Sequence, residues 1–182
     1  MASAHQLFSQ GAILGCLAVS TLVSVGNALQ PFPRMLDAVC AIAHTLPQPV
    51  IVQYGHTPFG CRACQGHAFF DMPTFEGHMA KAELVILHGG AGSVINAIRA
   101  GQVPVIVPRR AEFGEHINNH QVEFARQLAQ QERVVLVEDL SELQHAMLKA
   151  KGLRDHRIKG DALSPLVVAI KEILRRQSTQ DS

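Results

Sequence analysis

The sequence carries little net charge and no block of basic residues. Its 182 residues include 16 Lys and Arg against 15 Asp and Glu, a formal net charge of +1. A nucleic-acid-binding surface needs a basic patch or stripe, so we expect no nucleic-acid partner. Hydrophobic residues make up 47% of the chain, which supports a substantial core and argues against disorder. The length suits one α/β domain.

The common nucleotide-binding motifs of α/β proteins are also missing. No Gly-Lys-Ser/Thr follows Gly92, so the chain has no P-loop. No G-x-G-x-x-G follows the first predicted strand and no acidic residue ends the second, which disfavours a dinucleotide site. ATP hydrolysis and NAD chemistry are therefore disfavoured. No Asp-x-Asp occurs either, so a metal-bridged diphosphate lacks obvious ligands, and we expect neither a metal nor a cofactor.

Cysteines are few and unevenly spaced: Cys16, Cys40, Cys61 and Cys64. In a chain of this length the spacing does not indicate a disulfide framework, so it favours a reducing compartment. The last two form a C-x-x-C pair, a pattern typical of a redox couple or of half a zinc site, with His56 and His67 nearby. Because the pair lies in a Gly- and Pro-containing loop and no second C-x-x-C follows, we interpret it as incidental thiols.

Ionised side chains are missing from residues 6–33, and residues 11–25 are almost continuously apolar. A signal peptide would carry a positive n-region, and a membrane span needs about twenty apolar residues. We interpret residues 1–20 as a short leader or extension that leads into the first strand. Membrane contact, or a lipid anchor at Cys16, is the alternative.

Apolar runs alternate with amphipathic stretches along the rest of the chain. Strands are predicted at residues 21–25, 50–54, 68–70, 84–87, 103–107 and 134–137. Helices are predicted at residues 31–46, 73–82, from 91 onward, 115–130, 141–149 and 164–176, with a polar loop at 152–162. This alternation predicts an α/β fold, a Rossmann-like doubly wound parallel sheet with helices on both faces. Residues 21–150 form the predicted domain, and residues 151–182 a linker and C-terminal helix.

The most informative stretch is residues 83–108. A buried strand ends in His88, Gly89 and Gly90, and then Ala91, Gly92 and Ser93 open a helix. A glycine-rich turn that leads into a helix N-terminus favours anions, so a phosphate-bearing ligand is the leading hypothesis. His88 is expected to donate a hydrogen bond to a phosphate oxygen, worth about 1.5–3 kcal/mol if charge-assisted. The alternative is a strand-end histidine bonded to a backbone carbonyl.

Ligands of such sheets bind beyond the carboxyl ends of the strands. Gly26 and Asn27 follow the first strand and belong to this edge. Arg109 and Arg110 follow the fifth strand, where they either contact a diphosphate or form a solvated pair. Five polar residues, which we place on the first turns of one helix, suit ribose and sugar hydroxyls: Glu115, His116, Asn119, His120 and Gln121.

The run HGGAGSVINAIRAGQVPVIVPRRAEFGEHINNHQVEFARQLA resembles the donor-binding C-terminal domain of glycosyltransferase family 28. LVSVGN, FPRMLDAV and FFDMPTFEGHMAKAELVI extend the resemblance to about residues 21–145. Within that family the chain is similar to the small soluble subunits of two-component UDP-sugar transferases. These include the catalytic subunit of the dolichol-pathway N-acetylglucosaminyltransferase and its counterparts in bacterial exopolysaccharide synthesis.

The resemblance implies the C-terminal half of a GT-B enzyme. Such a chain binds the UDP-sugar, while a membrane-anchored partner subunit binds the lipid-linked saccharide acceptor. By the same resemblance the hexosyl transfer would be inverting and metal-independent, and the chain would be cytoplasmic, held at the inner membrane face through its partner. Where many relatives have a ribose-binding Glu, this chain has Asn96, a weaker hydrogen-bonding group.

Individual residues receive roles by position in the same way. Gly26 and Asn27 would line the diphosphate, and the polar group 115–121 would hold ribose or sugar. The phosphate loop would consist of His88, Gly89, Gly90, Gly92 and Ser93. The catalytic base is not assigned, and the weak local candidates are His116, Glu115 and His56. A UDP-sugar epimerase would need a second nucleotide-clasping domain, and a non-catalytic or regulatory nucleotide-binding subunit is the remaining alternative.

Overall fold

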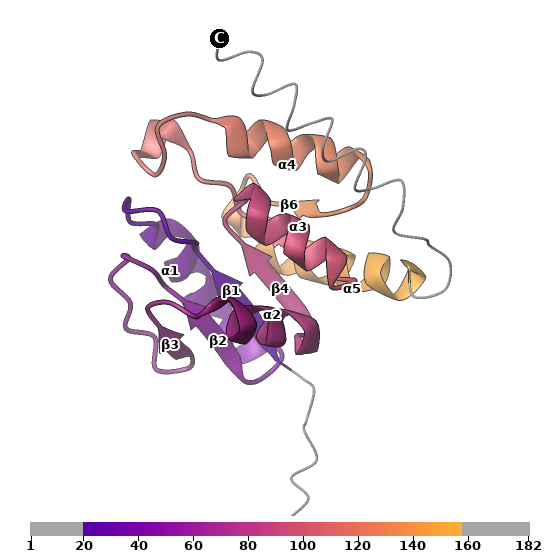
Figure 1. Ribbon diagram of the computed structural model, residues 1–182, viewed down its shortest axis with the longest axis horizontal. Coiled ribbons are helices and arrows are strands. Elements are labelled where there is room, and N and C mark those ends of the chain that lie inside the picture. The colour runs from indigo at the N-terminus through magenta and orange to yellow at the C-terminus, as the bar shows by residue number, and fades with distance from the viewer. Residues whose placement is uncertain (1–19, 158–182) are drawn as a thin grey trace, which may run out of the picture.

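The computed structural model describes residues 20–157 (Figure 1). The predicted leader before residue 20, Cys16 and the predicted last helix (164–176) lie outside the described residues. Among the described residues, no helix is both long enough and apolar enough to span a membrane.

Six parallel strands form one sheet in the order β3-β2-β1-β4-β5-β6. The strands are β1 (Thr21–Ser24), β2 (Val50–Gln53), β3 (Gln65–His67), β4 (Leu84–Leu87), β5 (Val105–Ile106) and β6 (Val135–Leu136). The helices are α1 (Pro33–Ile42), α2 (Met72–Lys81), α3 (Ala91–Arg99), α4 (His120–Gln130) and α5 (Leu143–Arg157). The strand order reverses direction between β1 and β4, which places a topological switch point between these two strands. The predicted doubly wound α/β fold is confirmed.

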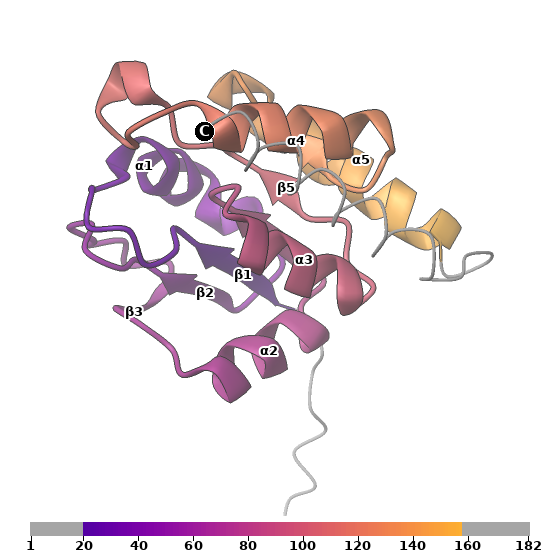
Figure 2. The same cartoon turned by 45° about the horizontal axis from the view of Figure 1, so that its top comes forward.

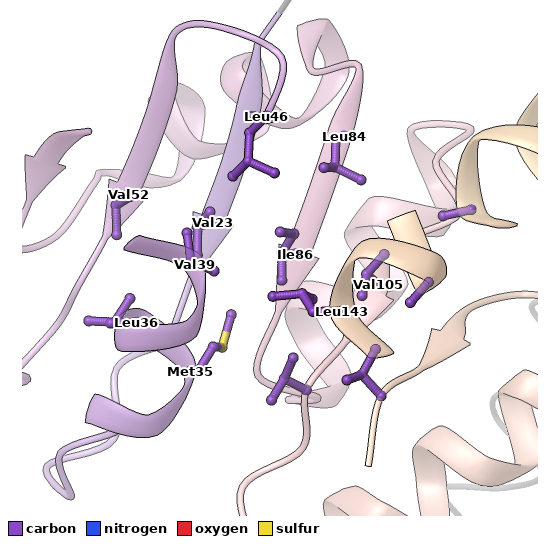
Figure 3. Packing of buried hydrophobic residues seen from close by; sticks show 14 of the residues in the cluster. Val23, Met35, Leu36, Val39, Leu46, Val52, Leu84, Ile86, Val105 and Leu143 are labelled. Carbon is purple, nitrogen blue, oxygen red and sulfur yellow. The ribbon is translucent and has the colours of Figure 1, made fainter. Parts of the chain in front are cut away.

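Helices cover both faces of the sheet (Figure 2). On one face α1 and α5 pack against the strands, through side chains that include Met35, Val39 and Leu143 (Figure 3). On the other face α2, α3 and α4 contribute a second buried cluster. Adjacent residues of β1 supply opposite faces, because Val23 belongs to the first cluster and Leu22 to the second. The central strands are therefore buried on both sides, which explains their continuous apolar runs.

Side-chain hydrogen bonds satisfy backbone groups at both ends of α2. Asp71 is its N-cap, and the carboxylate Oδ1 accepts a hydrogen bond from the Thr74 N–H at 2.8 Å. At the other end the buried side chain of Gln102 donates from Nε2 to the carbonyl oxygens of Met79 and Ala82, each at 2.9 Å. These bonds satisfy carbonyl groups that the helix end leaves without an intrahelical partner.

Three predicted boundaries are wrong. β3 lies at Gln65–His67 rather than at 68–70, because Phe70 leaves the sheet edge and its N–H donates to the side chain of Gln53. α4 begins at His120 rather than at 115, because long-range bonds hold residues 115–119 in an irregular segment. α5 continues to Arg157 instead of giving way to a loop at 152, since Arg154 is bonded to the carbonyl groups of residues 82 and 83.

The cysteines also differ from expectation. Cys40 at the end of α1 and Cys61 in the β2–β3 loop are joined in a disulfide, with 5.8 Å between their Cα atoms. The interpretation of Cys61 and Cys64 as a pair of incidental thiols is therefore wrong for Cys61. Cys64 keeps its thiol and packs against the α1 face of the core, where burial raises its pKa. Sequence spacing alone could not show this pairing, because the fold brings α1 against the β2–β3 loop.

Candidate functional site

A pocket of about 250 Å³ opens at the carboxyl ends of β1, β2 and β4, beside the switch point. Its polar wall consists of Gly26, Asn27, Gln53, His88, Gly90, Ala91, Gly92 and Ser93. Its apolar wall consists of Phe70, Met72 and Phe75. The pocket therefore has one end suited to a charged group and one suited to a flat or apolar group.

The N-terminus of α3 faces this pocket. Gly90 is the N-cap residue and no side chain caps the helix, whose first intrahelical hydrogen bond runs from the Val94 N–H to the Gly90 carbonyl at 3.1 Å. Helix geometry leaves the N–H groups of residues 91–93 without intrahelical acceptors. Together with the Ser93 hydroxyl and the helix dipole, they provide donors and positive potential for an anion.

His88 forms the floor of the polar end. Its side chain is almost fully buried, and Nδ1 lies 3.4 Å from the carbonyl oxygen of Ser24. Because a carbonyl oxygen only accepts, this contact assigns the proton to Nδ1 and leaves a lone pair on Nε2. Burial, helped by the positive charge of Arg109 and by His116, lowers the pKa of His88 to about 4, against the opposing effect of the Ser24 carbonyl. The imidazole is therefore neutral at neutral pH.

Gly26 and Gly90 let the backbone pass close to the imidazole of His88. A Cβ atom at Gly26 or at Gly90 would collide with the imidazole of His88. Gly26 also has a φ of +74°, which side-chain-bearing residues rarely adopt. At Gly92, in contrast, a Cβ would meet nothing within 4 Å. The glycines predicted for phosphate approach thus include two that are required by the packing of His88.

Arg109 is fully buried next to the pocket rather than exposed in it. Its guanidinium donates to three carbonyl oxygens: Gln30 at 2.7 Å, Val25 at 2.8 Å and Glu115 at 3.1 Å. The same group lies 4.8 Å from the ring centroid of Phe32, a cation–π contact. The alternative of a solvated basic pair is wrong for Arg109. It joins the loop after β1 to the loop after β5.

Glu115 is also buried, and its carboxylate is engaged within the protein. Arg34 donates from Nε and Nη2 to the two carboxylate oxygens at 2.9 Å each, and the Arg110 N–H donates to Oε2 at 3.0 Å. The Arg34 guanidinium additionally lies over the rings of Phe32 and Phe113. In this structure Glu115 therefore links the loop after β5 to α1.

The remaining polar candidates lie outside the pocket lining. Asn119 accepts a hydrogen bond from the Ala111 N–H at 2.9 Å, and Gln121 accepts one from the Arg109 N–H at 3.2 Å. His116 contacts Asn118 through Nδ1 at 3.1 Å. His120, Asn96 and His56 do not line the pocket either. Gly89 of the predicted phosphate loop also lies outside the lining, at a turn with a φ of +91°.

Sequence reasoning missed the amide of Gln53 and the apolar wall. Gln53 is buried, donates from Nε2 to the Asn27 side chain at 3.2 Å, and accepts from the Phe70 N–H at 3.3 Å. A polar residue that ends a buried apolar strand is a signal that could have identified Gln53. Phe70 makes tilted ring contacts with His67 and His78, with ring centroids 4.7 and 5.0 Å away. Among the described residues, no group of three or more His, Cys, Asp or Glu could hold a metal ion.

Comparison with known proteins identifies the architecture. Residues 30–158 match the glycosyltransferase family 28 C-terminal domain. The UDP-N-acetylglucosamine transferase subunit ALG13 of Yarrowia lipolytica is 31% identical over 135 residues, which is 65% of this chain and 64% of that protein. The alignment thus spans less than two thirds of this relative.

Two solved structures share the fold. The glycosyltransferase of kitacinnamycin superposes with a TM-score of 0.59 and 18% identity, covering 97% of this chain and 42% of that one. CalG4, the calicheamicin glycosyltransferase, superposes with a TM-score of 0.57 and 21% identity, covering 86% and 43%. This chain has the fold of the C-terminal half of GT-B glycosyltransferases and spans less than half the length of either enzyme.

Proposed function

Because this chain belongs to the glycosyltransferase family 28 C-terminal domain family, we propose that it is the donor-binding subunit of a UDP-sugar transferase. The observation that carries the proposal is the uncapped N-terminus of α3, which opens into a pocket with one polar and one apolar wall. The diphosphate binds at residues 90–93, where unpaired N–H groups and the Ser93 hydroxyl surround it. The name of the Yarrowia relative favours UDP-N-acetylglucosamine as the donor.

The two walls orient the nucleotide along the pocket. The uracil ring lies against Phe70 and Met72, because aromatic and thioether side chains contact flat rings favourably. The free amide hydrogens of Asn27 and Gln53 then face the region between base and phosphate. This orientation leaves the sugar directed out of the pocket, toward a bound acceptor.

The chemistry that we propose is an inverting displacement without a metal ion. An acceptor hydroxyl attacks the anomeric carbon of the sugar, the bond from that carbon to the UDP oxygen breaks, and a base removes the hydroxyl proton. The charge that develops on UDP is stabilised by the N–H groups and dipole of α3, in the manner of an oxyanion hole. Among the described candidates, Glu115 is engaged with Arg34, and His56 and His116 lie outside the pocket lining. We assign the base to a second subunit.

The name of the Yarrowia relative, a transferase subunit, also supports a second subunit. The fold of this chain matches one part of two glycosyltransferases, 42–43% of each. We propose that a partner with the acceptor-binding half faces the carboxyl edge of the sheet and closes the cleft over the donor. The acceptor that we expect is a lipid-linked saccharide, presented to the pair at a membrane surface.

Calorimetric titration with UDP, without added metal, tests the donor site. We expect UDP to bind more tightly than UMP or ADP, because both the diphosphate and the base contribute. Ser93→Ala should weaken UDP binding about tenfold through the loss of one hydrogen bond to an anion. Ser141→Ala, an exposed serine at the start of the short helix η3 (Leu140–Glu142), is the matched control and should bind normally.

Equal affinities for UDP, UMP and ADP would contradict a uridine diphosphate site. Wild-type affinity in Ser93→Ala would remove Ser93 from the site. Tight UDP binding without sugar transfer by the complex with the partner subunit would instead support a regulatory nucleotide-binding subunit.

A further inference from the structure

We propose that the pocket takes up one proton when it binds the diphosphate of the donor, and that the proton binds to Nε2 of His88. This inference rests on the proposed function, because it concerns how the same pocket holds a UDP-sugar. It adds a proton to the binding step and breaks no bond of the donor. The proton comes from the solvent, and it returns to the solvent when the nucleotide leaves.

The contacts of the His88 imidazole identify Nε2 as the nitrogen that takes up the proton. Nδ1 contacts the Ser24 carbonyl, so it keeps its hydrogen in both states. Nε2 has no hydrogen-bond partner among the described residues, although His88 is only 8% exposed and lines the pocket. The backbones of Gly26 and Gly90 lie against the ring and leave no space for a Cβ atom. The tautomer is therefore set before the ligand arrives, with the lone pair available for a proton.

The surroundings keep the unliganded ring neutral. The charged and titratable groups that act on His88 are Arg109 and His116, both in the segment after β5, and both disfavour a second positive charge. Strand β1 contributes only the carbonyl group of its last residue, Ser24, which favours the cation. The N-terminal turn of α3 carries the positive end of the helix dipole and no ionisable side chain. Burial adds to these effects, and the pKa is about 4.

A bound diphosphate reverses this balance. The diphosphate of a UDP-sugar carries two negative charges near neutral pH, and opposite charge at short range raises the pKa of a histidine. A phosphate oxygen next to the bare lone pair of Nε2 would be repelled, whereas a protonated Nε2 donates a charge-assisted hydrogen bond. Binding and protonation therefore favour each other, and affinity should increase as the pH falls, by up to about tenfold per pH unit.

Titration calorimetry in two buffers of different ionisation enthalpy measures the proton directly. The probe is UDP-N-acetylglucosamine, because free UDP has a terminal phosphate that itself titrates near neutrality. Near pH 6.5 we expect an uptake of about one proton per donor bound by the wild-type chain. His88→Gln, which keeps a hydrogen-bonding side chain without a titratable ring, should bind more weakly with an uptake near zero.

His78→Gln is the matched control. His78 is also a histidine with a lowered pKa, and it contacts Phe70 of the pocket. Because His78 itself does not line the pocket, its replacement should leave the proton uptake unchanged. Donor binding by the wild type without uptake would overturn the inference and leave the proposed function intact. The same uptake in His88→Gln would also overturn it. If the donor does not bind at all, the proposed function fails and the inference fails with it.

A second measurement uses the wild-type protein alone, so its result does not depend on whether a variant folds. The ¹⁵N chemical shift of Nε2 in the wild type distinguishes a bare nitrogen from a protonated one. We expect the bare nitrogen in the free protein and the protonated one in the complex with UDP-N-acetylglucosamine. An Nε2 that stays bare in the complex would overturn the inference.

Discussion

Arg109 donates a hydrogen bond from Nη2 to the carbonyl oxygen of Val25 at 2.8 Å, although 84 residues separate them. Val25 directly precedes Gly26, whose backbone lies against His88. The buried guanidinium therefore fixes the loop after β1 at the position that the imidazole requires. It also places a permanent positive charge near the polar end of the pocket without exposing it to the solvent.

Arg109→Met should destabilise the protein by about 3 kcal/mol or more, because it leaves three carbonyl oxygens, two of them in buried hydrogen bonds, without this donor. Chemical denaturation measures the free energy of unfolding. Arg110→Met is the matched control, since the neighbouring side chain makes more exposed contacts with Glu112 and Glu138, and should change stability by less than about 1 kcal/mol. Equal effects of the two variants would contradict the role of Arg109.

The glycines beside His88 should differ in their tolerance of alanine. Gly26→Ala and Gly90→Ala introduce a Cβ that collides with the imidazole, and we expect losses of about 2 kcal/mol or more in unfolding free energy. Gly92→Ala should be neutral or slightly stabilising, because its Cβ has free space and lies in a helix. A comparable loss in Gly92→Ala would show that strain at the start of α3, rather than a collision with the imidazole of His88, explains the need for glycine.

Stability should fall with acidity because of His88. The unfolded chain binds a proton near pH 6.5, whereas the folded chain binds it only near pH 4, so stability is complete above about pH 6.5 and is lost as the pH falls toward 4. Between about pH 7 and pH 5 we expect a loss of about 2 kcal/mol from this residue. Denaturation curves at both pH values measure it, and His88→Gln should show a correspondingly smaller loss. The same pH dependence in His88→Gln as in the wild type would show that other groups cause the loss of stability.

Glu115→Gln should affect the fold more than donor binding. It weakens the paired hydrogen bonds with Arg34 and leaves a half-buried guanidinium without its carboxylate, which should lower the unfolding free energy by about 1–3 kcal/mol. The affinity for UDP should stay within about twofold of the wild type. Glu112→Gln, at an exposed carboxylate, is the control for stability. A large loss of UDP affinity at unchanged stability would restore Glu115 as a donor ligand.

The sequence predicts those parts of the fold that depend on neighbouring residues. β4 was predicted at residues 84–87, where the structure has it, because a pure apolar run is bounded by Glu83 and by His88. The start of α3 at Ala91 follows equally from the glycine turn before it. The pocket at the switch point then follows from parallel topology, which brings the carboxyl ends of β1 and β4 together.

The remaining features depend on partners far along the chain. The helix predicted from residue 115 fails because Arg34, 81 residues away, holds Glu115 in an irregular segment. Arg109 resembles any arginine after a strand until its carbonyl partners are known. Cys61 pairs with Cys40 instead of its C-x-x-C neighbour because α1 packs against the β2–β3 loop. The hydrophobic periodicity of neighbouring residues does not reveal such long-range contacts.

The position of the diphosphate is the central claim, and a heteronuclear NMR titration with UDP-N-acetylglucosamine tests it most directly. We expect the largest backbone amide shifts at Gly92 and Ser93, with smaller ones at Asn27, because these N–H groups surround the polar end of the pocket. Shifts confined to residues 111–121, with the amides of 90–93 unmoved, would contradict a phosphate site at the N-terminus of α3.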